Sequence, residues 1–409
     1  AAGGTSLRNL AAYEALMVHT RARDAHAYGW QQWPADLQDP TGFAVDAFAR
    51  AQAHEVEFYA FAQWLADTQL TGVANRAAGM PIGLYRDLAV GVEPNSAEVW
   101  SDRESYCLGV CVGAPPDPMN LLGQNWGFAP FDPQTLRARA YAPYIALLRA
   151  NMRHAGALRI DHVMGLMRLF CIPAGAPSSD GTYVGYHFDE MLGILALESR
   201  RHRCMIVGED LGTVPEGFRA RLEAAGILGC RLLYFEREAD GKFRPPERYD
   251  EQAVASTGTH DLAPLAGFWA GSDLLERSRL HFFPDAERAA AAFDERAHAR
   301  KLLLSVLLAH KFLGMDDATS LEHALDSASN QLVFSLVLAA YQLLGRSKAR
   351  LLLVQLEDAF LLREQVNTPG TFDEVPNWRR RLPLTVDAFR EDDRLRQLLQ
   401  VVDASRAAR

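Results

Sequence analysis

The sequence predicts an α/β fold with a buried parallel sheet, and two observations carry this prediction. Six short apolar runs, each ending in a Gly or a polar residue, alternate with helical stretches in the 409-residue chain. Strands of a parallel sheet are covered on both faces, so they read as continuous apolar runs of this kind. Neither a GxGxxG nor a Walker loop is present to favour a doubly wound nucleotide-binding sheet. We therefore predict a (β/α)8 TIM barrel that lacks its first two strands in this chain.

The candidate strands occupy residues 81–88, 157–160, 204–207, 230–235, 252–256 and 350–356. Between the third and fourth runs, Thr213-Val214-Pro215-Glu216 has the pattern of a capping box, and Gly226 is placed to end the helix. A strand, a helix and a strand at this spacing predict a parallel βαβ unit.

The segments between these runs differ in character. Residues 7–78 repeat apolar side chains at helical spacing, as in Phe58, Phe61 and Trp64, and predict several helices. The insert at 101–141 is rich in Gly, Pro and Asn and too long for a plain connection, which is typical of a functional loop. A second insert, 271–321, is helical and charged, and 384–409 predicts an amphipathic helix.

Composition excludes several classes of protein. A net charge of -9 offers no broad positive field, so we expect no nucleic-acid partner. The longest apolar stretch, 332–344, is interrupted by Ser335 and Gln342, so we expect no membrane span. Five cysteines, an odd number without CxxC spacing, predict reduced thiols in a cytoplasmic protein. No cofactor motif is found.

Three of the apolar runs end in a carboxylate. They are 158–162 (LRIDH), 206–210 (IVGED) and 257–261 (TGTHD), which carry Asp161, Glu209 and Asp261. A lone carboxylate at a strand end often caps the next helix. In a barrel, however, the carboxyl ends of all strands meet at one mouth, so these acids are expected to face one pocket.

The neighbours of two of these acids predict different roles. Arg159 and Asp161 are two residues apart in a strand and point to the same face, so the guanidinium is expected to keep Asp161 ionised. Glu209 follows an apolar strand without a nearby basic residue, so burial is expected to raise its pKa. An anion and an acid held close together form the machinery of glycoside chemistry.

Two histidines adjoin these acids, and their function stays open at this level. His162 and His260 can each donate a hydrogen bond to a sugar hydroxyl or simply pack in the core. No HExxH or other ligand spacing accompanies them, so we expect no metal site. The aromatic loop 123–131 either stacks on sugar rings or pins itself to the core with Trp126 and Phe128. A second such segment, 367–379, follows the last strand.

Six motifs together resemble one family. They are 113–117 (GAPPD), 123–126 (GQNW), 158–162 (LRIDH), 207–212 (VGEDLG), 259–261 (THD), and 367–371 (NTPGT) with 376–378 (PNW). In this order the chain resembles the 4-α-glucanotransferases, or amylomaltases, of glycoside hydrolase family 77. The resemblance implies an α-retaining enzyme on a (β/α)8 barrel with inserted helical subdomains. Its donors and acceptors would be maltooligosaccharides or α-1,4-glucans, and it would need no cofactor.

The resemblance also implies residue roles. Asp161 matches the nucleophile, Glu209 the general acid/base, and Asp261 the carboxylate that stabilises the transition state. The remaining matches are substrate-binding positions: Arg159, His162, His260, Asp117, Trp126, Asn367 and Asp87. Asp117 and Trp126 match a loop that covers the acceptor side, where exclusion of water would favour transfer over hydrolysis.

The departure from the family lies at the start, where two barrel strands and a Ser-Pro-Tyr-Ser type segment are missing. We expect the chain to be organised as a helical subdomain inserted after the missing strands (1–78), the strand-3 region (79–100), the active-site loop (101–141), strands 4–7 (142–270), a helical insert (271–330), and the last strand with a subsite loop and C-terminal helices (331–409). A retaining α-glucan hydrolase and an inactive, truncated glucan-binding protein remain alternatives. A Rossmann-type oxidoreductase is more distant, because the dinucleotide glycines are absent.

Overall fold

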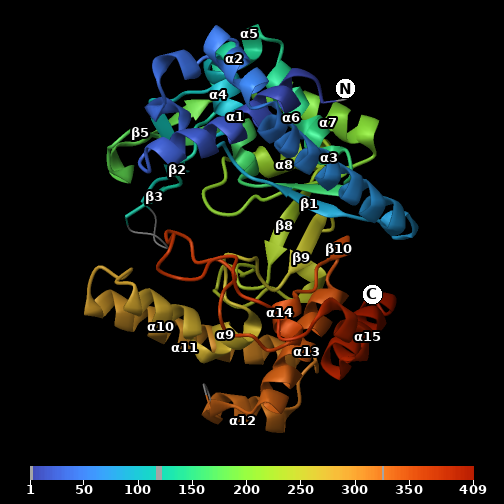
Figure 1. The fold of residues 1–409 in the computed structure, drawn as a ribbon. Helices are drawn as coiled ribbons and strands as arrows, with labels where there is room; N and C mark the ends of the chain where they lie inside the picture. Colours follow the sequence, from blue (N-terminus) through green and yellow to red (C-terminus); the bar gives the residue numbers. More distant parts are fainter. Residues whose placement is uncertain (1–2, 117–121, 325–326) are drawn as a thin grey trace. The chain divides into compact units, whose positions relative to one another are not determined.

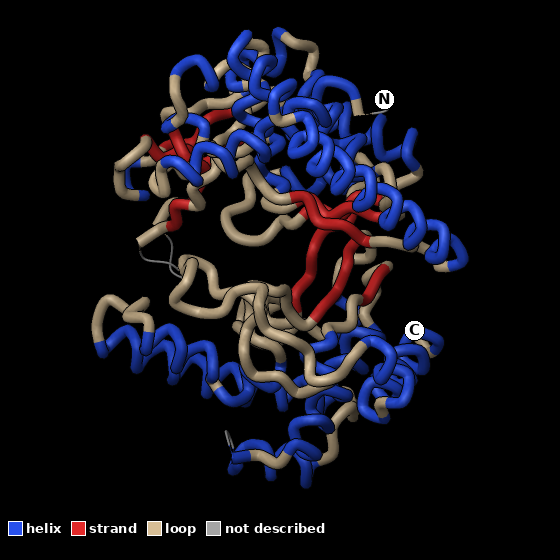
Figure 2. Tube along the Cα trace, viewed as in Figure 1, coloured by secondary structure: helices blue, strands red, loops and turns tan. Residues whose placement is uncertain are grey.

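The computed structural model describes residues 3–116, 122–324 and 327–409. The chain forms two compact units, Ala1–Ile227 and Leu228–Arg409, which we call unit 1 and unit 2. Figures 1 and 2 show the course of the chain and its helices and strands.

Each unit carries three of the parallel strands. In unit 1, β4 (Ala157–Ile160) pairs with β1 (Tyr85–Leu88) and with β7 (Met205–Gly208). The corresponding set in unit 2 consists of β8 (Leu228–Leu232), β9 (Ala253–Ser256) and β10 (Leu351–Leu352), with β9 in the middle. All six lie within or beside the predicted runs, so the α/β prediction is confirmed. The described residues hold six of a barrel's eight strands, and the barrel is incomplete.

Burial explains why these runs form strands. Every residue of β8 and β9 is buried, and in β4 and β7 only Arg159 and Met205 are not. Apolar side chains can be hidden on both faces only where helices cover the sheet, which is the geometry of parallel strands. Both β1 and β10 are less buried and pair on one side only within their units.

The helices of unit 1 follow the predicted alternation, with one correction. They are α1 (Gly4–Arg23), α2 (Phe43–Ala51), α3 (Ala53–Arg76), α4 (Ala97–Ser101), α5 (Pro133–Ala138), α6 (Ala142–Met152), α7 (Phe188–His202) and α8 (Phe218–Ala224). The predicted capping box at 213–216 is wrong, because Gly217 takes the left-handed conformation (φ 73°) and α8 starts after it. Gly226, also left-handed, follows the end of the helix as predicted.

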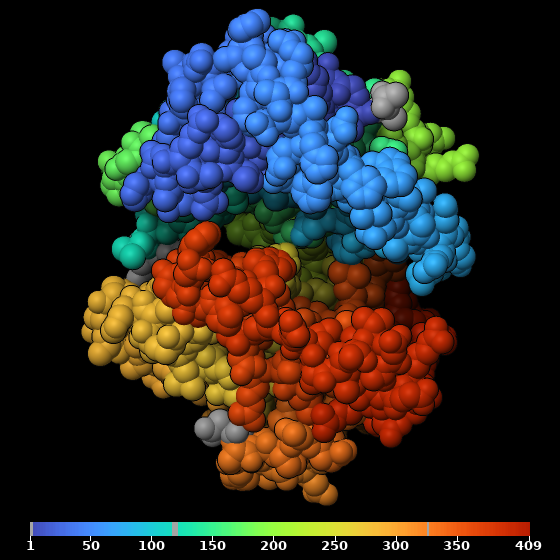
Figure 3. Space-filling model, viewed as in Figure 1, coloured from blue at the N-terminus to red at the C-terminus, as the bar shows by residue number. Residues whose placement is uncertain are grey.

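Helix α3 lies on the surface of unit 1, and none of its residues is buried (Figure 3). The apolar repeat that predicted it includes Phe58, Phe61 and Trp64, whose side chains are more than half exposed. The helix predicted from this repeat is confirmed, although the apolar repeat does not mark a buried face here.

A second, antiparallel sheet in unit 1 was not predicted. Its strand order is β3-β2-β5-β6, formed by β2 (Val110–Ala114), β3 (Gln124–Asn125), β5 (Arg168–Pro173) and β6 (Thr182–Gly185). Part of the insert 101–141 is thus ordered as strands. Each of these strands adjoins or ends in a Gly or Pro, which makes the region read as irregular loop in the sequence.

Unit 2 is mainly helical around its three strands. Its helices are α9 (Leu265–Ala270), α10 (Ser272–Arg279), α11 (Ala286–Ala309), α12 (Met315–Ala324), α13 (Asn330–Arg346), α14 (Leu356–Ala359) and α15 (Asp393–Ala407). The apolar stretch 332–344 lies in α13, which packs in the core of this unit. Across the described ranges, no helix has the length and apolarity needed to cross a membrane. The predicted terminal helix is real but begins only at Asp393.

Candidate active site

The strand ends of unit 1 bring two of the predicted acids together. The backbone N–H of Asp161 donates to the carbonyl of Leu88, and that of Glu209 donates to the carbonyl of Ile160, at 2.9 and 3.0 Å. These bonds extend the parallel ladders by one residue beyond β4 and β7. Both acids therefore leave the sheet from the carboxyl ends of neighbouring strands.

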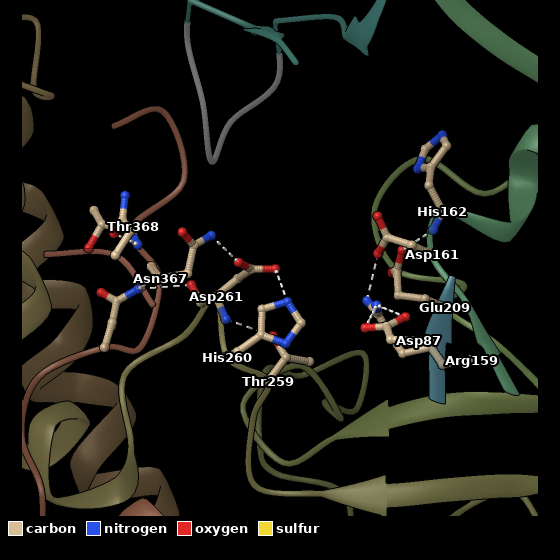
Figure 4. Close-up of polar contacts among 12 residues, drawn as sticks. Asp87, Arg159, Asp161, His162, Glu209, Thr259, His260, Asp261, Asn367 and Thr368 are labelled. Atoms are coloured by element: carbon tan, nitrogen blue, oxygen red, sulfur yellow. Dashed lines mark hydrogen bonds and ion pairs between the residues drawn. The ribbon is translucent and has the colours of Figure 1, made fainter. Parts of the chain in front are cut away.

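Arg159 connects two carboxylates in this group (Figure 4). Its Nη1 donates to both oxygens of Asp87, at 2.8 and 2.7 Å, and its Nη2 lies 2.7 Å from Oδ1 of Asp161. Burial alone lowers the pKa of Arg159, but the charges of Asp161 and Asp87 raise it above its usual value. The predicted contact between Arg159 and Asp161 is confirmed, and a permanent positive charge stands beside Asp161.

Glu209 is nearly inaccessible, with 9% of its surface exposed. Its two oxygens accept hydrogen bonds from the backbone N–H groups of His162 and Leu211, at 3.0 and 2.8 Å. These donors favour the ionised form, but burial outweighs them and raises the pKa of Glu209 to about 7, with a further contribution from the charge of Asp161. The predicted upward shift is confirmed, and Glu209 can hold or release a proton near neutral pH.

His162 is held as a neutral imidazole. Its backbone is left-handed (φ 44°), and burial lowers the pKa of the ring to about 4. The edge of the ring meets Trp126, with 5.2 Å between the ring centroids, and Trp126 donates from Nε1 to Oε1 of Gln124 at 3.1 Å. A neutral ring in this position can donate one hydrogen bond to a ligand and accept another.

The acid next to Glu209 has a different environment. Asp210 is 1% exposed, and its carboxylate accepts a hydrogen bond from Nε of Arg219 at 2.7 Å. Arg219 also donates to the carbonyl of Asp210, at 2.8 Å. Asp210 thus ties Arg219 of α8 to the end of β7.

Unit 2 carries a second group around Asp261, which follows β9. Oδ1 of Asp261 accepts a hydrogen bond from Nδ2 of Asn367 at 2.6 Å, and Oδ2 lies 3.3 Å from Nε2 of His260. The side chain of Gln365 donates to the carbonyls of Asp261 and Asn367, at 2.8 and 3.2 Å. Sequence reasoning missed Gln365, although its place two residues before the NTPGT motif is a usable signal.

The segment 366–378 is folded onto the Asp261 loop. The backbone N–H of Asn367 donates to the carbonyl of His260 at 3.0 Å, and that of Trp378 donates to the carbonyl of Val366, also at 3.0 Å. The rings of His260 and Trp378 lie 4.8 Å apart, and Trp378 is 62% exposed. The predicted neighbours His260, Asp261 and Asn367 therefore do form one group within unit 2 (Figure 4).

The structure thus assembles the predicted residues into two groups, one in each unit. Asp87, Arg159, Asp161, His162 and Glu209 form the first, with Trp126 at the edge of His162, and His260, Asp261 and Asn367 form the second. Asp117 lies outside the described residues. Among the residues that are described, no three His, Cys, Asp or Glu side chains come together as a metal site.

The first group has the chemistry of a carboxyl pair with divided roles. One member, Asp161, is paired with a guanidinium, and the other, Glu209, titrates near neutral pH. Such a pair can place a nucleophilic or stabilising anion beside a proton donor. The second group offers an oriented carboxylate, an imidazole and exposed aromatic surface, which suits hydrogen bonding and stacking with a polar ring.

Comparison with known proteins agrees with this chemistry. The family model described as 4-alpha-glucanotransferase matches residues 1–385. The chain is 43% identical over 372 residues to a 4-alpha-glucanotransferase of Mycobacterium tuberculosis, covering 88% of this chain and 49% of the relative. It is 38% identical over 362 residues to the 4-alpha-glucanotransferase of Haemophilus influenzae, covering 88% and 50%.

A solved structure shows the same fold. The crystal structure of amylomaltase from Corynebacterium glutamicum superposes with a TM-score of 0.84 at 30% sequence identity, over 98% of this chain and 54% of that one. The chain therefore spans about half the length of the curated relatives it matches. With a family match over most of its length, the chain belongs to the 4-alpha-glucanotransferase family.

Proposed function

We propose that the protein is a 4-α-glucanotransferase that cleaves an α-1,4-glucan and passes the glucanyl unit to the 4-hydroxyl of another sugar with retention. One observation carries the proposal: in a chain of this family, a buried Glu209 with a pKa near 7 adjoins an Asp161 that is paired with Arg159. Retaining glycoside transfer needs one carboxyl group as proton donor and a second, ionised one as nucleophile.

The reaction has two steps. In the first, a carboxylate oxygen of Asp161 attacks C1 of the donor sugar, the bond from C1 to the glycosidic oxygen breaks, and Glu209 gives that oxygen its proton. In the second, Glu209 takes the proton of the acceptor 4-hydroxyl, whose oxygen attacks C1 and releases Asp161. Two displacements restore the α configuration.

The remaining residues bind and orient the sugars. We assign to Asp261 the binding of the distorted ring and stabilisation of the positive charge that develops in the transition state. His162 and His260 supply hydrogen bonds, Arg159 holds Asp161, and Asp87 holds Arg159 in turn. Asn367 orients Asp261. For Asp117 and Trp126 we propose a place on the acceptor side, and for Asp117 this rests on the family motif alone.

The choice between transfer and hydrolysis is made after the first step. The glucosyl-enzyme meets water at tens of molar in an open site, so transfer requires a site that excludes water and holds the sugar hydroxyl at a high effective concentration. We propose that the insert 101–141, which carries Trp126, does this.

Incubation of the 409-residue chain with maltotriose tests the proposal, with the products resolved by length. A ladder of shorter and longer maltooligosaccharides, including glucose, is expected. Glucose and maltose alone would replace the proposal with a hydrolase. The absence of any product, in a chain that still binds maltotriose by calorimetry, would replace it with a glucan-binding protein. Incubation with labelled glucose and unlabelled maltose would then show, by label in maltose, whether exchange takes place, since exchange needs no net hydrolysis.

A further inference from the structure

The loop that carries Asp261 is anchored at both ends on one buried carboxylate in unit 2. Asp358, in α14, has no exposed surface. Its Oδ2 lies 2.7 Å from the hydroxyl of Thr257, which also lies 2.6 Å from Oε1 of Gln355, and its Oδ1 accepts a hydrogen bond from the backbone N–H of Leu265 at 2.7 Å. Thr257 directly follows β9, and Leu265 is the first residue of α9.

A third bond connects this carboxylate to the core of the unit. The hydroxyl of Tyr341, in the fully buried middle of α13, donates to Oδ2 of Asp358 at 2.8 Å and accepts from the backbone N–H of Gln355 at 3.0 Å. The core therefore fixes Asp358, and Asp358 fixes the span 257–265. Buried polar networks of this kind are rigid when every partner is satisfied.

The span 257–265 carries His260 and Asp261 between its two anchors. Its middle is held by the segment after α14, through Asn367 and Gln365, and by the hydroxyl of Tyr234, which donates to the carbonyl of Ala263 at 2.9 Å. That segment also leaves from α14, so Asp358 lies at the base of both loops that position Asp261. A carboxylate in the transition state must be placed to within fractions of an ångström, and a misplacement of about 1 Å can cost about 10²-fold in rate.

We propose that Asp358 is a positioning residue for the reaction, acting through Asp261: each of its two oxygens holds one end of the loop 257–265. The expected effect on turnover rests on the proposed function, whereas the anchoring of the loop 257–265 by Asp358 does not. It predicts that loss of either anchor affects turnover more than it affects substrate binding or global stability.

The decisive variants are Asp358→Asn and Thr257→Val, with Tyr341→Phe as the matched control. Asp358→Asn keeps the shape but turns one oxygen into an NH2 donor. That donor must face either the backbone N–H of Leu265 or the hydroxyls of Thr257 and Tyr341, so one set of bonds to Asp358 is disrupted. Thr257→Val removes one anchor and retains the carboxylate. If Asp358→Asn does not fold, this variant still tests whether the anchored loop is needed for turnover. Tyr341→Phe removes a bond to the same carboxylate, together with a 3.3 Å contact to the hydroxyl of Thr257 and the acceptor of the Gln355 N–H, but it keeps the bonds from Thr257 and Leu265 to Asp358.

We expect kcat on maltotriose to fall by about 10- to 100-fold in both anchor variants, with KM changed by less than about threefold, whereas Tyr341→Phe keeps kcat within about threefold at a similar loss of Tm. Equal losses of kcat in all three variants would overturn the proposal, since they would show a general loss of stability. Unchanged kcat in the anchor variants would overturn it as well.

Hydrogen–deuterium exchange separates this inference from the proposed function. Peptides covering 257–265 are expected to exchange about tenfold faster in Asp358→Asn and Thr257→Val than in wild type or Tyr341→Phe. If the wild-type chain shows no transferase activity, the proposed function fails, and this measurement still decides whether Asp358 anchors the loop. Unaltered exchange would reject the anchoring.

Discussion

Asp161 and Glu209 in unit 1 are held by different interactions from those that hold Asp261 in unit 2. Asp161 forms an ion pair with the guanidinium of Arg159, and the buried Glu209 accepts hydrogen bonds from two backbone N–H groups. Asp261 is instead held by the amide of Asn367 beside the ring of His260. A charged neighbour shifts the equilibrium between protonated and ionised forms, whereas an amide mainly fixes the orientation.

This difference matches the roles that we propose. The two acids that exchange bonds and protons with the sugar need their charge states set, and unit 1 sets them by an ion pair and by burial. A carboxylate that only stabilises the transition state needs a fixed position. The predictions below test whether the two groups are separable in this way.

The largest effect is expected from Asp161→Asn. An amide cannot form the glycosyl-enzyme, so kcat should fall by roughly 10⁴-fold or more. Binding of maltotriose, measured by calorimetry, should stay within a few fold, because the group that is lost acts on C1. Asp189→Asn is a matched control, since it removes one carboxylate from the same unit at a side chain that is 78% exposed. Full turnover by Asp161→Asn would rule out its role.

Glu209→Gln should give the next largest loss, and the loss should depend on the leaving group. Turnover of maltooligosaccharides should fall by roughly 10²- to 10⁴-fold, because the leaving oxygen is no longer protonated. A maltosyl fluoride donor needs no such help, so its first step should be nearly unaffected. Burst kinetics with both donors measure this contrast. Equal losses for the two donors would show that Glu209 is not the acid.

The pH profile should report the same residue without a substitution. The pKa of Glu209 is raised to about 7, so Glu209 is protonated below that pH and loses its proton above it. As an acid in the first step, it should make kcat/KM fall by about tenfold for each unit of pH above about 7. The fall of kcat/KM at low pH would report an apparent pKa of the coupled carboxyl groups as a pair. A profile that stays flat from pH 6 to 9 would contradict this assignment.

The smallest effects are expected from the supporting residues. Asp87→Asn weakens the ion pair with Arg159, and Asn367→Ala removes one hydrogen-bond donor to Asp261; each should lower kcat by about tenfold. Only Asp87→Asn changes the charges around the carboxyl pair, so only this variant should move the pH limb. If the pH limb moved in Asn367→Ala and not in Asp87→Asn, the charge state would be set by the Asp261 group, which contradicts the comparison.

Some features of this protein follow from local sequence. The strands could be predicted because burial on both faces forces continuous apolar runs, and the strand-end position marked Asp161, Glu209 and Asp261 as one class of residue. Arg159 and Asp161 could be paired because a strand puts residues two apart on the same face. The family motifs added the remaining site residues.

Other features were decided only by the tertiary structure. The bond between His162 and Glu209 spans 47 residues, and the bond between Asn367 and Asp261 spans 106, so no local pattern encodes them. The antiparallel sheet of unit 1 was not predicted because its strands lie among Gly and Pro and become strands by pairing. Burial, which raises the pKa of Glu209 and places Asp358 beneath the Asp261 loop, is likewise a property of the assembled core. Sequence alone predicted which residues are the candidates for the chemistry, because residue type and strand period are local. Folding decided their partners and charge states, because solvent exclusion and contacts between distant segments exist only in the packed chain.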